Sequence, residues 1–101
     1  MLHIINKSAG ATTTLQSMLA IAGSVSGNVV LLIEDAVYAA TKGNHAAGAL
    51  TDAMSSLKVY ALAPDLEARG VADRLIDGVA TVDYGGFVDL VVEQPNCQSW
   101  L

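Results

Sequence analysis

The sequence predicts an α/β fold: a small parallel sheet of four to five strands with helices on both faces, flavodoxin-like or Rossmann-like. Short apolar runs alternate with segments whose apolar residues recur at helical spacing, and the connections are long enough for crossovers. The run at 28–34, "NVVLLIE", is continuously apolar up to its final residue. Such a run is typical of a strand that is buried on both faces of a parallel sheet.

The first half of the chain supplies two of these strands. Residues 2–6 form a short apolar run, and "KSAGATTT" then leads into a helix. After the strand at 28–34, we expect a short helix that Asp35 caps and Gly43 ends. The helix between the two strands has an apolar stripe at Leu15, Met18, Leu19 and Ala22.

The second half supplies two more strands, at 58–61 and 79–82. Between them, "PDLEARG" has Pro near a helix start and Gly at its stop, which predicts a brief helix. Residues 84–94 carry apolar side chains at helical spacing before Pro95 ends the helix. The helix that precedes the strand at 58–61 has its stripe at Ala46, Leu50, Ala53, Met54 and Leu57.

Length and composition predict one domain over residues 1–101 that works inside an oligomer. The chain is 52% hydrophobic and 15% charged, and a body of about 100 residues leaves much of its surface exposed. An interface with other subunits is the favoured explanation for so much apolar surface. The formal charge is -5 and no basic run occurs, so we expect no direct contact with nucleic acid.

The chain has a single cysteine, which excludes an internal disulfide and fits a reducing compartment. No signal peptide and no apolar run long enough to cross a membrane is present, so we expect a soluble, cytoplasmic protein without membrane contact. The two histidines and one cysteine have no zinc-binding spacing, and no Walker or dinucleotide motif occurs. We therefore expect neither metal nor cofactor.

Candidate site residues follow the predicted strands, because ligands bind at the carboxyl ends of parallel strands. Glu34 and Asp35 could form an acid/base pair or half of a metal site, but adjacent strand residues point to opposite faces. His3 and His45 are expected to be ordinary packed or surface residues. The candidates at the strand ends are Lys7, Ser8, Glu34, Asp35, Asp65, Asp83 and Tyr84.

Cys97 is a weak catalytic candidate. A reactive thiolate needs a helix N-terminus or a nearby cation, and the residues beside Cys97 supply no positive charge. Trp100 and Leu101 have the character of an apolar plug that fixes the end of the chain. Two possibilities stay open, a reactive thiol or a packed, idle one.

Four stretches, in this order and spacing, resemble one family: "LHIINKS", "LLIEDAVYAA", "KVYALAPDLEARG" and "VDYGGFVDLVVEQPNCQSWL". The chain resembles the DsrH/TusB family of sulfur-relay proteins, within the DsrE/DsrF/DsrH superfamily, over nearly its whole length. The resemblance implies assembly with DsrE/TusD-like and DsrF/TusC-like subunits into a heterohexamer. Such complexes pass persulfide sulfur toward 2-thiouridine at the tRNA wobble position, or to a DsrC/TusE-like acceptor in sulfur oxidation.

The resemblance also implies that the main sulfur-bearing cysteine belongs to the DsrE/TusD-like partner. Some members carry a second cysteine in the first helix, where this chain has Met18, which cannot form a persulfide. We therefore expect a subunit that is not catalytic alone, with Trp100 and the strand-end groups as interface candidates. The alternatives are a stand-alone sulfur carrier that uses Cys97, or a small-ligand-binding module with an anion near "SAGATTT".

Overall fold

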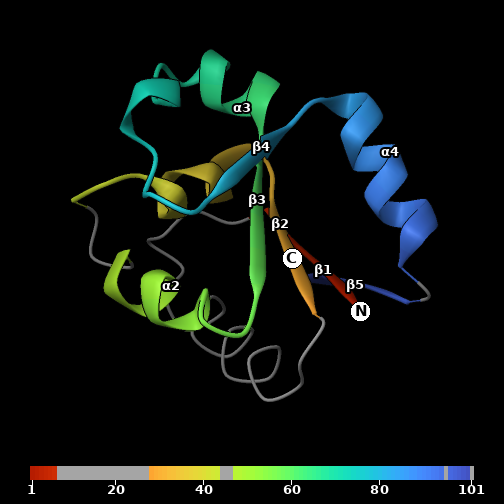
Figure 1. Cartoon of the computed structure of the whole chain (residues 1–101). Coiled ribbons are helices and arrows are strands. Elements are labelled where there is room, and N and C mark those ends of the chain that lie inside the picture. Colours follow the sequence, from red (N-terminus) through yellow and green to blue (C-terminus); the bar gives the residue numbers. More distant parts are fainter. Residues whose placement is uncertain (7–27, 44–46, 95, 101) are drawn as a thin grey trace.

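The computed structural model describes residues 1–6, 28–43, 47–94 and 96–100 (Figure 1). The predicted helix around residues 15–22 lies outside the described residues, as do Lys7, Ser8 and His45. Of residues 98–100, only the backbone is described.

The described residues form one five-stranded sheet in the order β4-β3-β2-β1-β5. Every neighbouring pair of strands is parallel, so the predicted parallel α/β fold is confirmed. The middle strand, β2, is buried along its whole length, as its continuous apolar run predicts. The strands are β1 (Leu2–Ile5), β2 (Val29–Leu32), β3 (Lys58–Leu62), β4 (Ala80–Val82) and β5 (Cys97–Trp100).

The strand β5 is a feature that the sequence analysis missed. It runs parallel to β1, with Cys97 opposite Leu2 and Trp100 opposite Ile5. The N–H of Leu2 also donates to the carbonyl of Asn96 at 2.9 Å. Backbone hydrogen bonds therefore hold this segment in the sheet, whereas Leu101 and the side chain of Trp100, on which the expected apolar plug rests, lie outside the described part of the chain.

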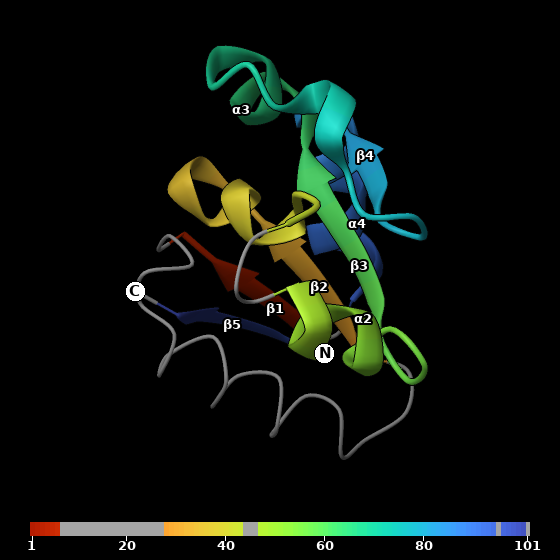
Figure 2. The ribbon, with the colours of Figure 1, turned by 90° about the vertical axis from the view of Figure 1, so that its left-hand side faces the viewer.

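Helices cover both faces of the sheet, as Figures 1 and 2 show from two directions. The helix α4 lies on one face, and η1 and α2 lie on the other, with α3 packed beside η1. The predicted helix at 35–43 is a 3-10 helix that begins one residue earlier, and the helix before β3 ends before Met54. The helices are η1 (Glu34–Ala40), α2 (Ala47–Ala53), α3 (Ala63–Ala68), η2 (Ala72–Arg74) and α4 (Tyr84–Glu93).

Alternate residues of β2 divide the core in two. Val30 and Leu32 point to the side of η1, α2 and α3, where they join a large apolar cluster. Val29 and Leu31 point the other way, into a smaller cluster that includes Leu90 of α4. Each face of the sheet is thus buried by its own layer of helices, as a parallel sheet requires.

Two residues fix the start of α4, the cap residue Asp83 and the glycine at position 86. Asp83 is the N-cap, and its side chain accepts a hydrogen bond from the N–H of Gly86 at 2.8 Å. An added Cβ at Gly86 would lie 2.9 Å from Cβ of Val82, so only glycine fits this close approach. These contacts set the direction in which α4 leaves the sheet.

His3 lies within β1 and is almost wholly buried, with 2% of its surface exposed. Burial, with a smaller contribution from the nearby amino terminus, lowers the pKa of His3 from its ordinary value of 6.5. The neutral imidazole is therefore the form that the folded protein favours, whereas the unfolded chain takes up a proton at about pH 6.5.

We expect replacement of Asp83 by Ala to lower the free energy of unfolding by about 1 kcal/mol, because the N–H of Gly86 loses its acceptor. Urea unfolding measures the change. Asp77→Ala is the matched control, because the Asp77 side chain is fully exposed. Its Oδ1 lies 3.8 Å from Nζ of Lys42 in a surface ion pair, and such pairs contribute little to stability. An equal loss in both variants would contradict a capping role.

The His3 environment predicts that the protein loses stability as the pH falls below about 6.5, until the folded-state pKa is passed. The unfolded state binds a proton in that range and the native state does not, so acid favours unfolding. We expect the free-energy difference between wild type and His3→Gln to shrink from pH 7.5 to pH 5. A difference that stays constant with pH would show that His3 does not titrate on unfolding.

Candidate functional site

The carboxyl ends of β2 and β3 meet at one edge of the sheet. Glu34, which follows β2, donates its backbone N–H to Oδ2 of Asp65, in α3 after β3, at 2.6 Å. Glu34 has a φ of 50°, in the left-handed region that residues other than glycine seldom adopt. Asp65 thus holds a strained turn directly after the middle strand of the sheet.

Arg69, which the sequence analysis did not single out, is the centre of this edge. Its Nε donates to Oδ1 of Asp35 at 3.0 Å, and its Nη2 lies 3.0 Å from the same oxygen. Its Nη1 lies 3.6 Å from Oδ1 of Asp65 and also donates to the Asp65 carbonyl at 3.3 Å. One guanidinium therefore ties η1 to α3. The four-residue spacing of Asp65 and Arg69 on a helix was the available signal.

The predicted cap by Asp35 is wrong. The N-cap of η1 is Ile33, whose side chain makes no capping hydrogen bond, and the N–H of Glu34 at the start of η1 is accepted by Asp65. The Asp35 carboxylate pairs with Arg69 instead, and Glu34 and Asp35 both belong to η1 rather than to the end of a strand. The hydrogen bonds and ion pairs at the carboxyl ends of β2 and β3 therefore join η1 to α3.

Two further predicted site residues lie at the start of α4. Tyr84 is the first residue of α4 and is 63% exposed. Asp83 beside it is engaged as the helix cap. Lys7 and Ser8 lie outside the described residues, and the side chain of Trp100 is likewise not described.

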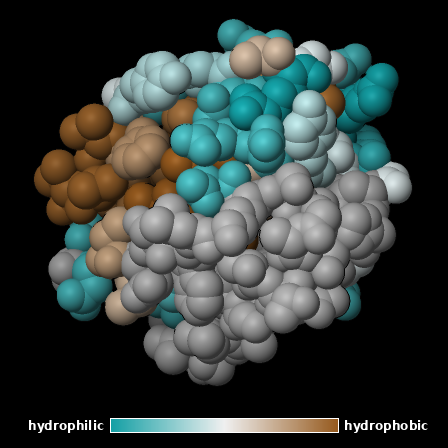
Figure 3. Space-filling model, turned by 180° about the vertical axis from the view of Figure 1, so that it is seen from behind, coloured by the Kyte–Doolittle hydropathy of each residue, from teal (hydrophilic) through white to brown (hydrophobic). Residues whose placement is uncertain are grey.

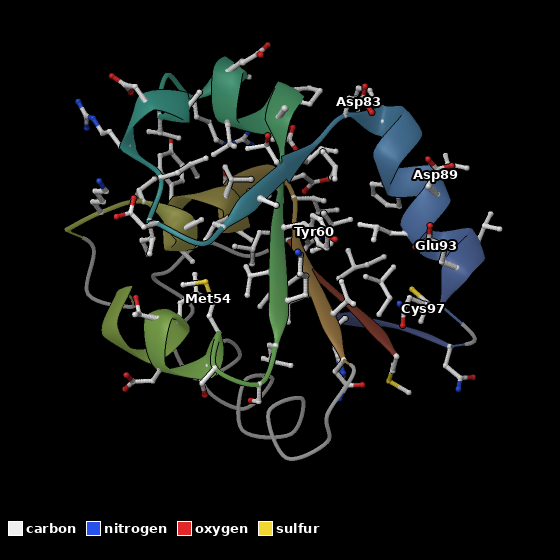
Figure 4. All side chains as sticks on the ribbon, viewed as in Figure 1. Met54, Tyr60, Asp83, Asp89, Glu93 and Cys97 are labelled. Atoms are coloured by element: carbon white, nitrogen blue, oxygen red, sulfur yellow. The ribbon has the colours of Figure 1, made fainter. Side chains whose placement is uncertain are left out.

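Cys97 lies at the opposite end of the sheet from the edge formed by Glu34, Asp35, Asp65 and Arg69. It is exposed, it pairs with Leu2 at the start of β1, and Figure 4 places it near the end of α4. The strand length between these two edges is about 10 Å at 3.3 Å per residue. A helix N-terminus or a nearby cation normally stabilises a reactive thiolate. Cys97 instead follows the carboxyl end of α4 in the sequence.

The part of the chain that the structure describes holds neither a cluster of metal ligands nor a pocket. Among these residues, no three His, Cys, Asp or Glu side chains gather where a metal ion could be held. No pocket opens between them. None of the described helices is both long and apolar enough to cross a membrane.

Two solved structures have the same fold. The ychN protein from E. coli superposes with a TM-score of 0.75 and 17% identity, covering 97% of each chain. MTH1491 from Methanobacterium thermoautotrophicum, a protein of unknown function, gives a TM-score of 0.74 and 17% identity, covering 97% of this chain and 95% of its own. At such identities the similarity shows the fold alone.

Sequence comparison shows the family. The chain is 40% identical over 74 residues to Protein TusB of Salmonella dublin and to Protein TusB of Salmonella enteritidis PT4. In both cases the match covers 73% of this chain and 76% of the relative. The family model described as "DsrH like protein" matches residues 7–97, so the chain belongs to the DsrH/TusB family.

Proposed function

We propose that this chain is a non-catalytic subunit of a sulfur-relay complex. The observation that carries the proposal is the family match over residues 7–97, together with 40% identity to TusB proteins. In a persulfide relay, an acceptor thiolate attacks the outer sulfur of a persulfide, the S–S bond breaks, and the donor leaves as a thiolate. Each station of the relay therefore needs an accessible, activated cysteine.

The surroundings of Cys97 support a non-catalytic role. Cys97 is exposed, but the hydrogen bond between Glu34 and Asp65 and the ion pair between Arg69 and Asp35 lie at the other end of the sheet. Met18, which lies outside the described residues, stands where some relatives of the resembled family carry a cysteine. Sulfur chemistry in the complex then belongs to cysteines of the partner subunits.

The proposed partners are two related small α/β subunits, one DsrE/TusD-like and one DsrF/TusC-like, in a heterohexamer. This chain contributes one domain, residues 1–101, and a DsrC/TusE-like protein accepts the sulfur. The formal charge of -5 fits a subunit that does not itself hold tRNA. The single cysteine fits a cytoplasmic location.

Two destinations of the sulfur fit this proposal, tRNA wobble 2-thiouridine and sulfur oxidation. The genes beside this one distinguish them. A tRNA thiouridylase gene nearby supports the first destination, whereas a gene for a DsrC-like protein or a sulfite reductase supports the second.

The proposal predicts that the tagged chain, purified from its own cells at its natural level, carries two similarly small α/β proteins in equal amounts. Native mass spectrometry measures the assembly, and a dimer of heterotrimers is the expected mass. The tag alone, expressed in the same cells, is the control. A lone monomer or a homo-oligomer would contradict the relay-subunit proposal.

The exposure of Cys97 favours one alternative, a stand-alone sulfur carrier. On the main proposal, Cys97→Ser leaves sulfur transfer by the assembled complex unchanged, because no sulfur passes through that thiol. The assay follows radiolabelled sulfur from a cysteine desulfurase to the final acceptor. Abolished loading in Cys97→Ser, together with persulfide formation on the isolated wild-type chain, would establish the alternative instead.

A further inference from the structure

The outward face of α4 is apolar and exposed. Of the large apolar side chains exposed among the described residues, most lie on this one helix. Figure 3 shows the resulting apolar area on the left of the molecule, over α4. This α4 patch consists of Tyr84, Val88, Val91 and Val92, which are 63%, 59%, 40% and 78% exposed.

These side chains are not part of the apolar cluster that holds α4 on the sheet. The other face of α4 already packs on the sheet through Leu90 and Phe87, and Asp83 caps the helix. At 100° per residue, apolar side chains occupy about 200° of the helix circumference, far more than packing on one face requires. Valine is also a poor helix former, so helix stability does not explain three exposed valines.

The rim of the patch is acidic. Asp89 and Glu93 follow one another along α4 in Figure 4, Asp83 stands before them as the N-cap, and the helix contains no Lys, Arg or His. A pair of these helices in a symmetric dimer would bring four carboxylates, Asp89 and Glu93 of each copy, around one apolar contact. Like charges facing each other across an interface oppose association, so a second copy of this chain is a poor occupant.

We propose that the α4 patch is the surface on which a partner subunit of the relay complex docks, an inference that rests on the proposed function. The matching surface of that partner is apolar at its centre and carries Lys or Arg opposite Asp89 and Glu93. Apolar side chains at the centre and charged ones at the rim are the usual arrangement of protein interfaces. The same rim charges select a basic partner over a second copy.

The apolar centre is tested with the double variant Val88→Gln, Val92→Gln. Glutamine favours a helix more than valine does, so the variant keeps α4, which circular dichroism and thermal unfolding verify. Co-purification with the partner subunits is expected to fall at least tenfold. Thr51→Gln is the matched control, because Thr51 is a β-branched, exposed helical residue on α2, which lies on the other face of the sheet. It is expected to leave assembly unchanged.

The rim is tested with Asp89→Lys, Glu93→Lys. These changes also lie on the exposed side of α4, and they replace attraction to a basic partner with repulsion. Association with the partner subunits is expected to slow at low salt by about tenfold or more, and the difference from wild type is expected to shrink as salt rises. Faster association of this variant would overturn the inferred basic partner.

The outcomes separate this inference from the proposed function. If wild type and the Val88→Gln, Val92→Gln variant assemble equally well, the α4 patch is not the docking surface and the relay-subunit proposal stands. If wild type does not assemble with two related subunits, the relay proposal fails and this inference fails with it. A wild-type homodimer that the same variant dissolves would show that a second copy occupies the patch, which overturns the inferred partner.

Discussion

Parallel pairing of β1, β2 and β3 is the constraint on which the rest of this structure depends. Parallel strands need crossover connections, and their two faces must both be covered because the strands are apolar on both sides. The buried residues of β2 meet this condition by sending Leu32 to one cluster and Leu31 to the other. Parallel pairing also places every strand's carboxyl end at the same edge, which is why Glu34 and Asp65 meet although they are distant in sequence.

The same constraint keeps three features of the molecule apart. The pairs made by Arg69 lie at the carboxyl edge, Cys97 lies at the amino edge, and the α4 patch lies on the outside of a covering helix. A catalytic site would bring a nucleophile and polar groups together, whereas here the described polar groups at the carboxyl edge bind each other. The proposed function, a subunit that supplies a stable body and a contact surface, is consistent with this separation.

Much of the fold could be predicted from the sequence, because long apolar runs and helical spacing depend on local composition. β2 and α4 are the clearest cases, and Pro64 and Gly70 bound α3 as expected. β5 could not be predicted because "CQSW" holds few strand-favouring residues. This strand is stabilised by pairing with the free edge of β1. The Asp35 cap was wrong because Arg69, which lies 34 residues further along, competes for the carboxylate. Contacts between distant elements of this kind leave little trace in local patterns.

The pairing of β1 with β5 has a consequence for how the protein is made. The two strands lie at nearly opposite ends of the sequence, so β5 leaves the ribosome on the order of 5–20 s after β1 at ordinary synthesis rates. Until then β1 can pair with β2 on one side only, and its other side is a bare sheet edge that could capture a strand from another nascent chain. Co-translational folding of the sheet therefore cannot finish before β5 is synthesised, and during that interval the bare edge of β1 is a site for aggregation.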